Sequence, residues 1–310
     1  MKQKMLKGID ISEFNGNIDF KKLKNEVDFI YIRATYGRYG IDKRFYEYTS
    51  EAIKNEIPLG FYYYSYATDE TKAEEEVYFF LSQIQQFKDF ITYPLAIDME
   101  DSDGYKVNNG NPDKDILTNI CIKACEKIAE KSFTPIIYAC EDWFKNHLDF
   151  EKLGTYLKWI AFWETKEENI DKSKYSIWQY SSKGKVNGIS TNVDLNYSFV
   201  DFARLKEYIE NISKINFIKS KTMINDLSIQ YMSCYKWGND LLNKIYKALN
   251  SSDKLVYKEL ELDEMKKEVK KYIGLEQKTI DYLSVFLYEE DLFRLLYNAI
   301  CGKTIEIKEN

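Results

Sequence analysis

Four carboxylates stand at or near the ends of three apolar runs in this 310-residue chain. Asp10 lies in the first run, Asp98 and Glu100 end a central run, and Asp194 lies in the last one. The chain has 50 Asp and Glu but a single His, His147, so a Ser-His-Asp triad or a multi-His zinc site would have to be built around that residue. We expect His147 to lie on the surface or to pack against a helix. Acid–base chemistry is therefore expected from carboxylates.

The spacing of the central pair matters because side chains alternate between the two faces of a strand. In Leu95-Ala-Ile-Asp-Met-Glu100, the alternation places Ala96, Asp98 and Glu100 on the inner face. An inward carboxylate loses hydration free energy unless it is paired or used. One alternative is that the acids simply neutralise Arg33, which should also face inward. Because acids from three strands converge, a functional site is favoured.

A cluster of carboxylates suits one kind of chemistry in particular. Mutual repulsion raises the pKa of some members while others stay ionised. Cleavage of a glycosidic bond needs one protonated carboxyl to donate to the leaving oxygen and one carboxylate to stabilise the oxocarbenium-like transition state. Magnesium could use a similar cluster, but the chain has no Walker-type glycine loop. We expect no metal and no other cofactor.

Aromatic residues make up 16% of the chain. A coding bias toward Lys, Asn, Ile and Tyr would explain part of this abundance. Many aromatics nevertheless fall at predicted strand ends, namely Tyr62, Tyr64, Tyr66, Tyr138, Trp163, Trp178 and Tyr180. Flat rings with a polar tip suit a sugar ring, so their position beside the acids predicts a saccharide groove. The predicted substrate-binding residues are Arg33, Tyr62, Tyr64, Tyr138, Trp163 and Gln179.

Short apolar runs alternate with amphipathic stretches before residue 212. The predicted strands are Gly8–Ile11, Phe29–Thr35, Leu59–Tyr66, Leu95–Met99, Pro135–Ala139, Lys158–Phe162, Ser176–Tyr180 and Val193–Asn196. The predicted helices are Phe45–Asn55, Asp69–Phe87 and Lys114–Lys131, with Phe199–Ile212 as a closing helix. Strands separated by helices favour parallel pairing, and eight of them favour a closed barrel. The last strands follow too closely for crossover helices, so the spacing predicts an α/β fold, a (β/α)5β3 irregular TIM-like barrel.

The chain changes character near residue 212. All 4 Pro and most of the 13 Gly precede this point, and the later segments follow a helical period. We predict a barrel domain at residues 1–212 and a small all-α helical bundle at residues 213–310. The predicted helices of the bundle are Asn239–Leu249, Glu259–Ile273 and Glu276–Cys301, preceded by Ile218–Met232.

The net charge and the length of the apolar runs limit the kinds of partner that the chain could bind. The net charge of −6, without a basic stripe, disfavours nucleic acid. No apolar run approaches the ~20 residues that would span a bilayer, so no membrane partner is expected. The 5 Cys include no Cys-x-x-Cys pair. Cys121 and Cys125, four apart on a predicted helix, are expected to be small buried apolar residues in a reducing compartment. The N-terminal segment lacks the apolar region of a signal peptide.

Five segments, taken in their order along the chain, together resemble glycoside hydrolase family 25, the Chalaropsis-type lysozymes or N-acetylmuramidases. They are Gly8-Ile-Asp-Ile-Ser12, Phe29-Ile-Tyr-Ile-Arg-Ala-Thr35, Ile97-Asp-Met-Glu100, Ile177-Trp-Gln-Tyr180 and Val193-Asp-Leu-Asn196. The resemblance covers about residues 6–205. It implies the same barrel and cleavage of the β-1,4 bond between N-acetylmuramic acid and N-acetylglucosamine in peptidoglycan. One departure is Tyr62-Tyr63-Tyr64, where the family often has Tyr-His-Phe/Tyr.

The resemblance also implies roles for the four acids. Glu100 corresponds to the general acid. Asp98 corresponds to the second carboxylate, either as a nucleophile or as the group that holds the substrate's N-acetyl. Asp10 and Asp194 complete an acidic floor. Two alternatives stay open: a carbohydrate-binding barrel without hydrolysis, and a glycosidase acting on another N-acetylated polymer such as chitin.

A muramidase followed by a separate module and lacking a signal peptide resembles a bacteriophage endolysin. Such an enzyme is made in the host cytoplasm and acts on the bacterial cell wall after release. The helical domain is then expected to bind the cell wall, to form a homo-oligomer, or to do both.

Overall fold

The computed structural model describes residues 5–154 and 156–303. The chain divides into two compact units, Met1–Arg204 and Leu205–Asn310. Helix α6 (Phe202–Thr222) runs across this division. The predicted closing helix therefore does not end at Ile212, because no Pro or Gly interrupts the helical pattern before Thr222. The boundary predicted at residue 212 falls inside α6.

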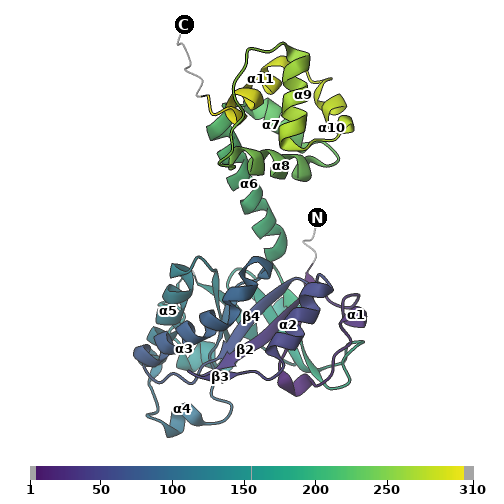
Figure 1. Cartoon of the computed structure of the whole chain (residues 1–310). Helices are drawn as coiled ribbons and strands as arrows, with labels where there is room; N and C mark the ends of the chain where they lie inside the picture. Colours follow the sequence, from purple (N-terminus) through teal and green to yellow (C-terminus); the bar gives the residue numbers. More distant parts are fainter. Residues whose placement is uncertain (1–4, 155, 304–310) are drawn as a thin grey trace. The chain divides into compact units, whose positions relative to one another are not determined.

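The first unit contains a barrel (Figure 1). Its strands are β1 (Leu6–Ile11), β2 (Phe29–Tyr36), β3 (Gly40–Ile41), β4 (Leu59–Tyr64), β5 (Leu95–Asp98), β6 (Pro135–Cys140), β7 (Leu157–Ala161), β8 (Ile177–Gly184) and β9 (Val193–Ser198). The sheet order is β1-β9-β8-β7-β6-β5-β4-β2-β3, and pairing of β1 with β2 closes a ring of eight strands. The short β3, which the sequence did not predict, adds antiparallel to the end of β2.

One strand of this ring runs opposite to the other seven. The pairs from β1 through β2, β4, β5, β6 and β7 to β8 are parallel. The last strand, β9, is antiparallel to both β8 and β1. The connection between β8 and β9 is too short for a crossover helix, so the chain returns as a hairpin. This reversal brings the beginning of β9 to the edge where the other strands end.

Helices follow the early strands. They are α1 (Phe20–Leu23), α2 (Phe45–Lys54), α3 (Glu70–Ile84), α4 (Tyr105–Asn108) and α5 (Lys114–Glu130). The side chains of Asp69 and Asp113 cap α3 and α5 by accepting from the backbone N–H three residues on. On α3 the residues Val77, Phe80, Leu81 and Ile84 are buried, and on α5 Leu117 is buried whereas Ile116 is 40% exposed.

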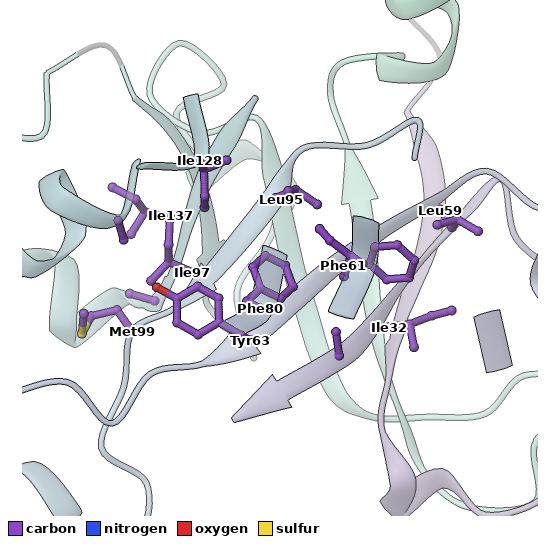
Figure 2. Close-up of a cluster of buried hydrophobic side chains, with 14 of the residues drawn as sticks. Ile32, Leu59, Phe61, Tyr63, Phe80, Leu95, Ile97, Met99, Ile128 and Ile137 are labelled. Carbon is purple, nitrogen blue, oxygen red and sulfur yellow. The ribbon is translucent and has the colours of Figure 1, made fainter. Parts of the chain in front are cut away.

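The main hydrophobic core lies between the outer face of the barrel and the helices around it. Figure 2 shows this packing, with Phe80 of α3 among side chains from four strands. The labelled residues are Ile32, Leu59, Phe61, Tyr63, Phe80, Leu95, Ile97, Met99, Ile128 and Ile137, and all are buried. These side chains alternate with inward ones, so packing against the helices fixes which residues point into the barrel.

A second cluster fills the barrel interior below the strand ends. It contains Phe29, Tyr31, Tyr93, Ala96, Ile136, Trp159, Ile177 and Phe202. The rings of Phe29 and Tyr93 stack with centroids 4.4 Å apart, and those of Tyr31 and Trp159 lie 4.5 Å apart. Phe202 of α6 contacts Tyr93 at 5.4 Å. This aromatic plug fills the part of the barrel where the parallel strands begin.

The second unit is helical. After α6 it contains α7 (Asp226–Ser233), α8 (Gly238–Leu249), α9 (Leu262–Ile273), α10 (Gln277–Leu283) and α11 (Glu289–Ile300). The predicted helix Glu276–Cys301 is wrong, because the chain turns between α10 and α11 and makes two helices of it. Across the described residues, no helix combines the length and the apolar character needed to cross a membrane.

The two halves of the second unit repeat each other. The end of α6, α7 and α8 correspond to α9, α10 and α11, with equivalent residues 51 positions apart as for Tyr231 and Tyr282. Buried positions coincide in this alignment, including Ile218 with Val269 and Leu241 with Leu292. The first helix of each half is followed by a left-handed residue, Met223 with φ 60° and Gly274 with φ 73°. We did not detect this duplication from the sequence.

A reciprocal pair joins the two halves. The Tyr231 hydroxyl donates to the backbone oxygen of Tyr282 at 2.8 Å, and the Tyr282 hydroxyl donates to that of Tyr231 at 2.9 Å. Their rings stack at 4.6 Å. Tyr231 also stacks on Phe286 at 4.3 Å, and Tyr282 stacks on the equivalent Tyr235 at 4.3 Å. The halves therefore contact each other through equivalent residues, as the two partners of a symmetric dimer do.

This pair makes a quantitative prediction. Tyr231→Phe and Tyr282→Phe should each lower the free energy of unfolding of the helical unit by ~1 kcal/mol, because each leaves one buried carbonyl without its donor. Urea unfolding followed by circular dichroism at 222 nm measures both losses. Tyr288→Phe, at a 41% exposed position, serves as the matched control and should be neutral. A loss in one variant but not in the other would contradict the equivalence.

Candidate active site

A cleft of about 350 Å³ opens at the end of the barrel where the parallel strands terminate. Its lining comprises Asp10, Phe14, Arg33, Tyr62, Tyr64, Asp98, Glu100, Ser102, Tyr138, Trp159, Trp163, Gln179, Ser182 and Asp194. All of the site residues predicted from the sequence, both acids and substrate-binding residues, are in this set. The structure therefore brings them together in one place, as barrel geometry requires.

Asp10 and Asp194 form the floor on the side of β1 and β9. They are direct partners in the antiparallel register of these strands. Asp10 Oδ2 accepts from Nε2 of Gln179 at 2.9 Å and from Nδ2 of Asn196 at 2.8 Å. Burial and the nearby charge of Asp10 raise the pKa of Asp194 to about 8. At neutral pH, Asp194 therefore holds a proton and donates it in a hydrogen bond to the Asp10 carboxylate.

Asp98 and Glu100 lie across the cleft from this pair, at the end of β5 and just beyond it. Asp98 is 6% exposed, and within the described residues its Oδ1 has no hydrogen-bond partner. Burial raises the pKa of Asp98, and the charge of Glu100 raises it further. Burial also raises the pKa of Glu100, while the ammonium of Lys106 opposes that rise. Both shifts favour the protonated form of these carboxyls, which is the form that a general acid needs.

Gln179 connects the aromatic wall to the acids. Its Oε1 accepts from the Tyr138 hydroxyl at 3.1 Å and from Nε1 of Trp163 at 3.0 Å. The Nε2 group then donates to Asp10. These three bonds fix the orientation of the amide, which in turn holds the Asp10 side chain in place. Trp163 is 48% exposed, so its ring is available to contact a ligand.

Arg33 is already paired. Its Nε donates to Asp42 at 2.9 Å, its Nη2 contacts Glu13 at 3.3 Å, and its guanidinium lies 5.0 Å from the ring of Phe14. The alternative in which the site acids exist to neutralise Arg33 is therefore not supported, because other carboxylates do so. Arg33 borders the cleft and supports Phe14 at its rim.

Three aromatics of the predicted groove lie elsewhere. Trp178 is buried and donates from Nε1 to the oxygen of Phe162, and Tyr180 stacks on Tyr197 at 4.6 Å. Tyr66 borders a neighbouring hollow and donates from its hydroxyl to Asp103. Strand alternation explains Trp178 and Tyr180, since Gln179 between them points inward. His147 is on the surface, 3.4 Å from Asp142.

Sequence reasoning missed several residues of the site. Phe14, Ser102, Trp159 and Ser182 line the cleft, and Lys106 lies behind it. The alternation of β7 could have identified Trp159, whose Nε1 donates to Asn196 at 2.8 Å. Ser182 lies in β8, where the register with β9 is irregular. Phe14, Ser102 and Lys106 lie in loops or short helices without a periodic signal. In the described ranges, no group of three or more His, Cys, Asp or Glu side chains is arranged to hold a metal ion.

A closed strand barrel with a carboxylate-rich, aromatic-walled cleft at the strand ends has the features of a glycoside-cleaving enzyme. Residues 9–189 match the glycosyl hydrolases family 25, and the chain belongs to this family. It is 30% identical over 191 residues to the autolytic lysozyme of Clostridium acetobutylicum, covering 61% of this chain and 55% of the relative. A lysozyme of Streptococcus phage Cp-9 is 27% identical over 143 residues, which cover 43% of this chain and 39% of that protein.

A similar structure is the modular autolysin LytC of Streptococcus pneumoniae, solved in complex with a synthetic peptidoglycan ligand. The TM-score is 0.57 at 27% identity, over 63% of this chain and 47% of LytC. The chain thus spans about half of the length of the autolytic lysozyme and of LytC.

The raised pKa of Asp194 makes a pH-dependent prediction. The pKa of Asp194 is higher in the folded than in the unfolded chain. Such an acid lowers the free energy of unfolding more and more as the pH rises from about 4 to 8, because the unfolded chain releases the proton first. Asp194→Asn removes this cost. The variant should be more stable than the wild type by ~1 kcal/mol or more at pH 8 and nearly equal to it at pH 4.5. Urea unfolding followed by tryptophan fluorescence tests this. Equal differences at both pH values would show that Asp194 is not protonated in the folded protein.

Proposed function

We propose that this chain is a peptidoglycan hydrolase that cleaves the β-1,4 bond between N-acetylmuramic acid and N-acetylglucosamine. The observation that carries the proposal is the convergence of Asp10, Asp98, Glu100 and Asp194 on one aromatic-walled cleft. Membership of family 25 and similarity to lysozymes and an autolysin support it. We also propose the (β/α)5β3 designation for the barrel, supported by its helix-poor last strands.

In the proposed mechanism, Glu100 protonates the leaving glycosidic oxygen. Its half-buried carboxyl borders the cleft, and its raised pKa favours the protonated form that this step needs. Asp98, deeper in the barrel, stabilises the positive charge that develops on the sugar, either directly as a nucleophile or by orienting the substrate's N-acetyl. Asp10 accepts hydrogen bonds from Gln179 and Asn196, which oppose the rise of its pKa on burial, and its ionised form would add negative potential from the opposite side.

The aromatic wall gives the proposed substrate its orientation. Trp163 and Tyr138 are tied to Gln179, so their rings are fixed before a sugar arrives. Tyr64 is held from the other side by Ser102, whose side chain and backbone N–H both lie 3.1 Å from the Tyr64 hydroxyl. A glycan bound between these rings would place a glycosidic bond over Asp98 and Glu100.

The helical region is proposed to attach the enzyme to the bacterial cell wall, with self-association as the alternative. The proposed catalytic part is residues 1–212, and the proposed binding part is residues 213–310. The duplication of the helices supports attachment, because two similar halves suit a repeating polymer. The proposed site of action is the cell wall of a bacterium after release from a host, as in a phage endolysin.

Mass spectrometry of the soluble products from purified peptidoglycan tests the main proposal. Fragments with muramic acid at the reducing end are expected. Fragments with N-acetylglucosamine at the reducing end would indicate a different specificity, and release from chitin alone would indicate another polymer. Binding to the wall without any release would identify a carbohydrate-binding barrel.

Glu100→Gln preserves the shape of the side chain but cannot donate a proton. Loss of general acid catalysis should lower the rate of fragment release ~10²–10⁴-fold while binding to purified walls is retained. Glu75→Gln, which breaks an exposed ion pair with Arg38 outside the cleft, is the matched control and should stay within about twofold. Near-normal lysis by Glu100→Gln would overturn the assignment of the acid. Asp98→Asn should also lose most activity without unfolding.

A chain truncated after Ile212 tests the role of the helical region. It should fold, because all barrel strands and Phe202 of the aromatic plug are retained. It should cleave solubilised glycan as well as the full chain does but lyse whole cells ~10²-fold less well at low concentration, because attachment raises local concentration. Equal lysis of whole cells would contradict attachment. A changed mass in solution with unchanged wall affinity would identify the helices as an oligomerisation element.

A further inference from the structure

A lysine is buried directly behind the central acid pair. Lys106 is 2% exposed although it belongs to the short helix α4 at the mouth of the barrel. Lysine ammonium groups are rarely buried, because the loss of hydration is large unless it is compensated. This lysine is therefore kept inside by specific contacts.

The contacts of Lys106 join two strand ends. Its Nζ donates to the backbone oxygen of Glu100 at 2.7 Å and to that of Ser65, the residue that follows β4. Ser65 in turn donates from its N–H to the oxygen of Asp98 at 3.1 Å. The ammonium thus fixes the peptide of Glu100 against the neighbouring strand. Within the described residues, no carboxylate forms an ion pair with it.

Side chains around Lys106 keep it in this position. Its backbone N–H and that of Val107 donate to the Asp101 carboxylate at 2.7 and 3.1 Å. The ammonium lies 5.6 Å from the ring of Tyr64 and 5.9 Å from that of Trp143, within cation–π range. Tyr64 also lines the cleft, so the lysine contacts both the acid pair and the aromatic wall.

The charge of Lys106 acts on several acids at once. The titratable groups that face it are Glu76 of α3, Asp98 of β5, Asp101 of the following loop and Cys121 of α5. Five charged groups face Asp98 or Glu100: Lys106, Asp103, Asp10 of β1, Arg33 of β2 and Asp194 of β9. The Cys140 thiol of β6 also faces Glu100. The Lys106 ammonium lowers the pKa of Glu100, whereas Asp10 and Asp103 raise it.

We propose that Lys106 is a positioning residue for the glycosidic cleavage, because its ammonium fixes the Glu100 peptide against the end of β4 and its charge opposes protonation of the neighbouring Asp98–Glu100 pair. This inference builds on the proposed function. Without the positive charge, the repulsion among Asp98, Glu100 and Asp10 would be less strongly opposed, and the pKa of both Asp98 and Glu100 would rise further.

The test is the pH dependence of kcat for Lys106→Met on solubilised glycan. Both limbs of the profile should move to higher pH by on the order of one unit, since an opposite charge is removed from both acids. A one-unit shift of the acidic limb appears as a roughly tenfold loss of kcat below that limb, whereas KM should stay within about twofold. A substitution that acts through packing alone would scale the profile without moving it.

Lys158→Met is the matched control. Lys158 is also buried, at 3% exposure, and its Nζ donates to the backbone oxygens of Gly154 and Tyr156 at 2.8 and 3.0 Å. It lies outside the cleft, so this variant should lose stability without moving either limb of the profile. If Lys106→Met and Lys158→Met both leave the limbs in place, the proposal is overturned.

Rescue separates charge from shape. Lys106→Ala lacks the atoms of propylammonium, so adding propylammonium chloride should restore kcat at pH 5 at least fivefold, whereas tetramethylammonium chloride at the same ionic strength should not. Equal effects of the two salts would contradict a role for the ammonium.

If the Lys106 variants do not fold, carboxyl ¹³C titration of the wild-type protein provides the decision, with signals assigned from Asp98→Asn and Glu100→Gln. One carboxyl of the pair should be ionised at pH 6, and two protonated carboxyls would overturn the proposal. This titration does not require activity. An enzyme that releases no muramic acid ends would therefore refute the proposed function separately.

Discussion

Burial of carboxylates at one end of a closed barrel is the constraint on which this site depends. The ladder around β5 places Asp98 between Tyr64 of β4 and Tyr138 of β6, so its side chain cannot turn to water without breaking the register. Hydration is lost, and the pKa of each acid rises. The fold offsets this loss of hydration to different extents at different acids. Asp10 receives two amide donors, whereas Asp98 Oδ1 is left unpaired among the described residues. Hydrogen bonds thus oppose the rise of the pKa at Asp10, whereas the charge of Glu100 adds to the rise at Asp98.

The aromatic plug makes the constraint possible. Trp159 is the member of the plug that connects it to the acids. Its ring centroid lies 4.5 Å from that of Tyr31, and its Nε1 donates to Asn196. Asn196 then donates to Asp10. Two hydrogen bonds therefore connect the ring packing below the cleft to the Asp10 carboxyl. A side chain too small to fill the position of Trp159 would both open a cavity in the plug and leave Asn196 free to rotate.

Strand alternation and element spacing were enough to predict most of this site. Both depend on local patterns that the sequence carries directly, such as the inward positions of Leu95-Ala-Ile-Asp-Met-Glu100. The residues that escaped prediction lie where no period operates. Lys106 belongs to a four-residue helix, and Phe14 and Ser102 lie outside the strands, so only tertiary packing places them. The contact between the two halves of the helical unit, through Tyr231 and Tyr282, likewise joins segments far apart in the chain.

The reversal of β9 explains why the site has acids on opposite walls. In a barrel of parallel strands alone, only residues at strand ends reach the open mouth. Because β9 runs antiparallel, Asp194 near its beginning reaches the level of Asp10 near the end of β1, and the two become direct partners. The hairpin that produces the reversal is too short to carry a helix, so this side of the cleft is bordered by side chains of the strands and their loops, among them Trp163, Gln179 and Ser182. The loss of helices from the last strands and the presence of a paired acid opposite Asp98 and Glu100 thus have one topological cause.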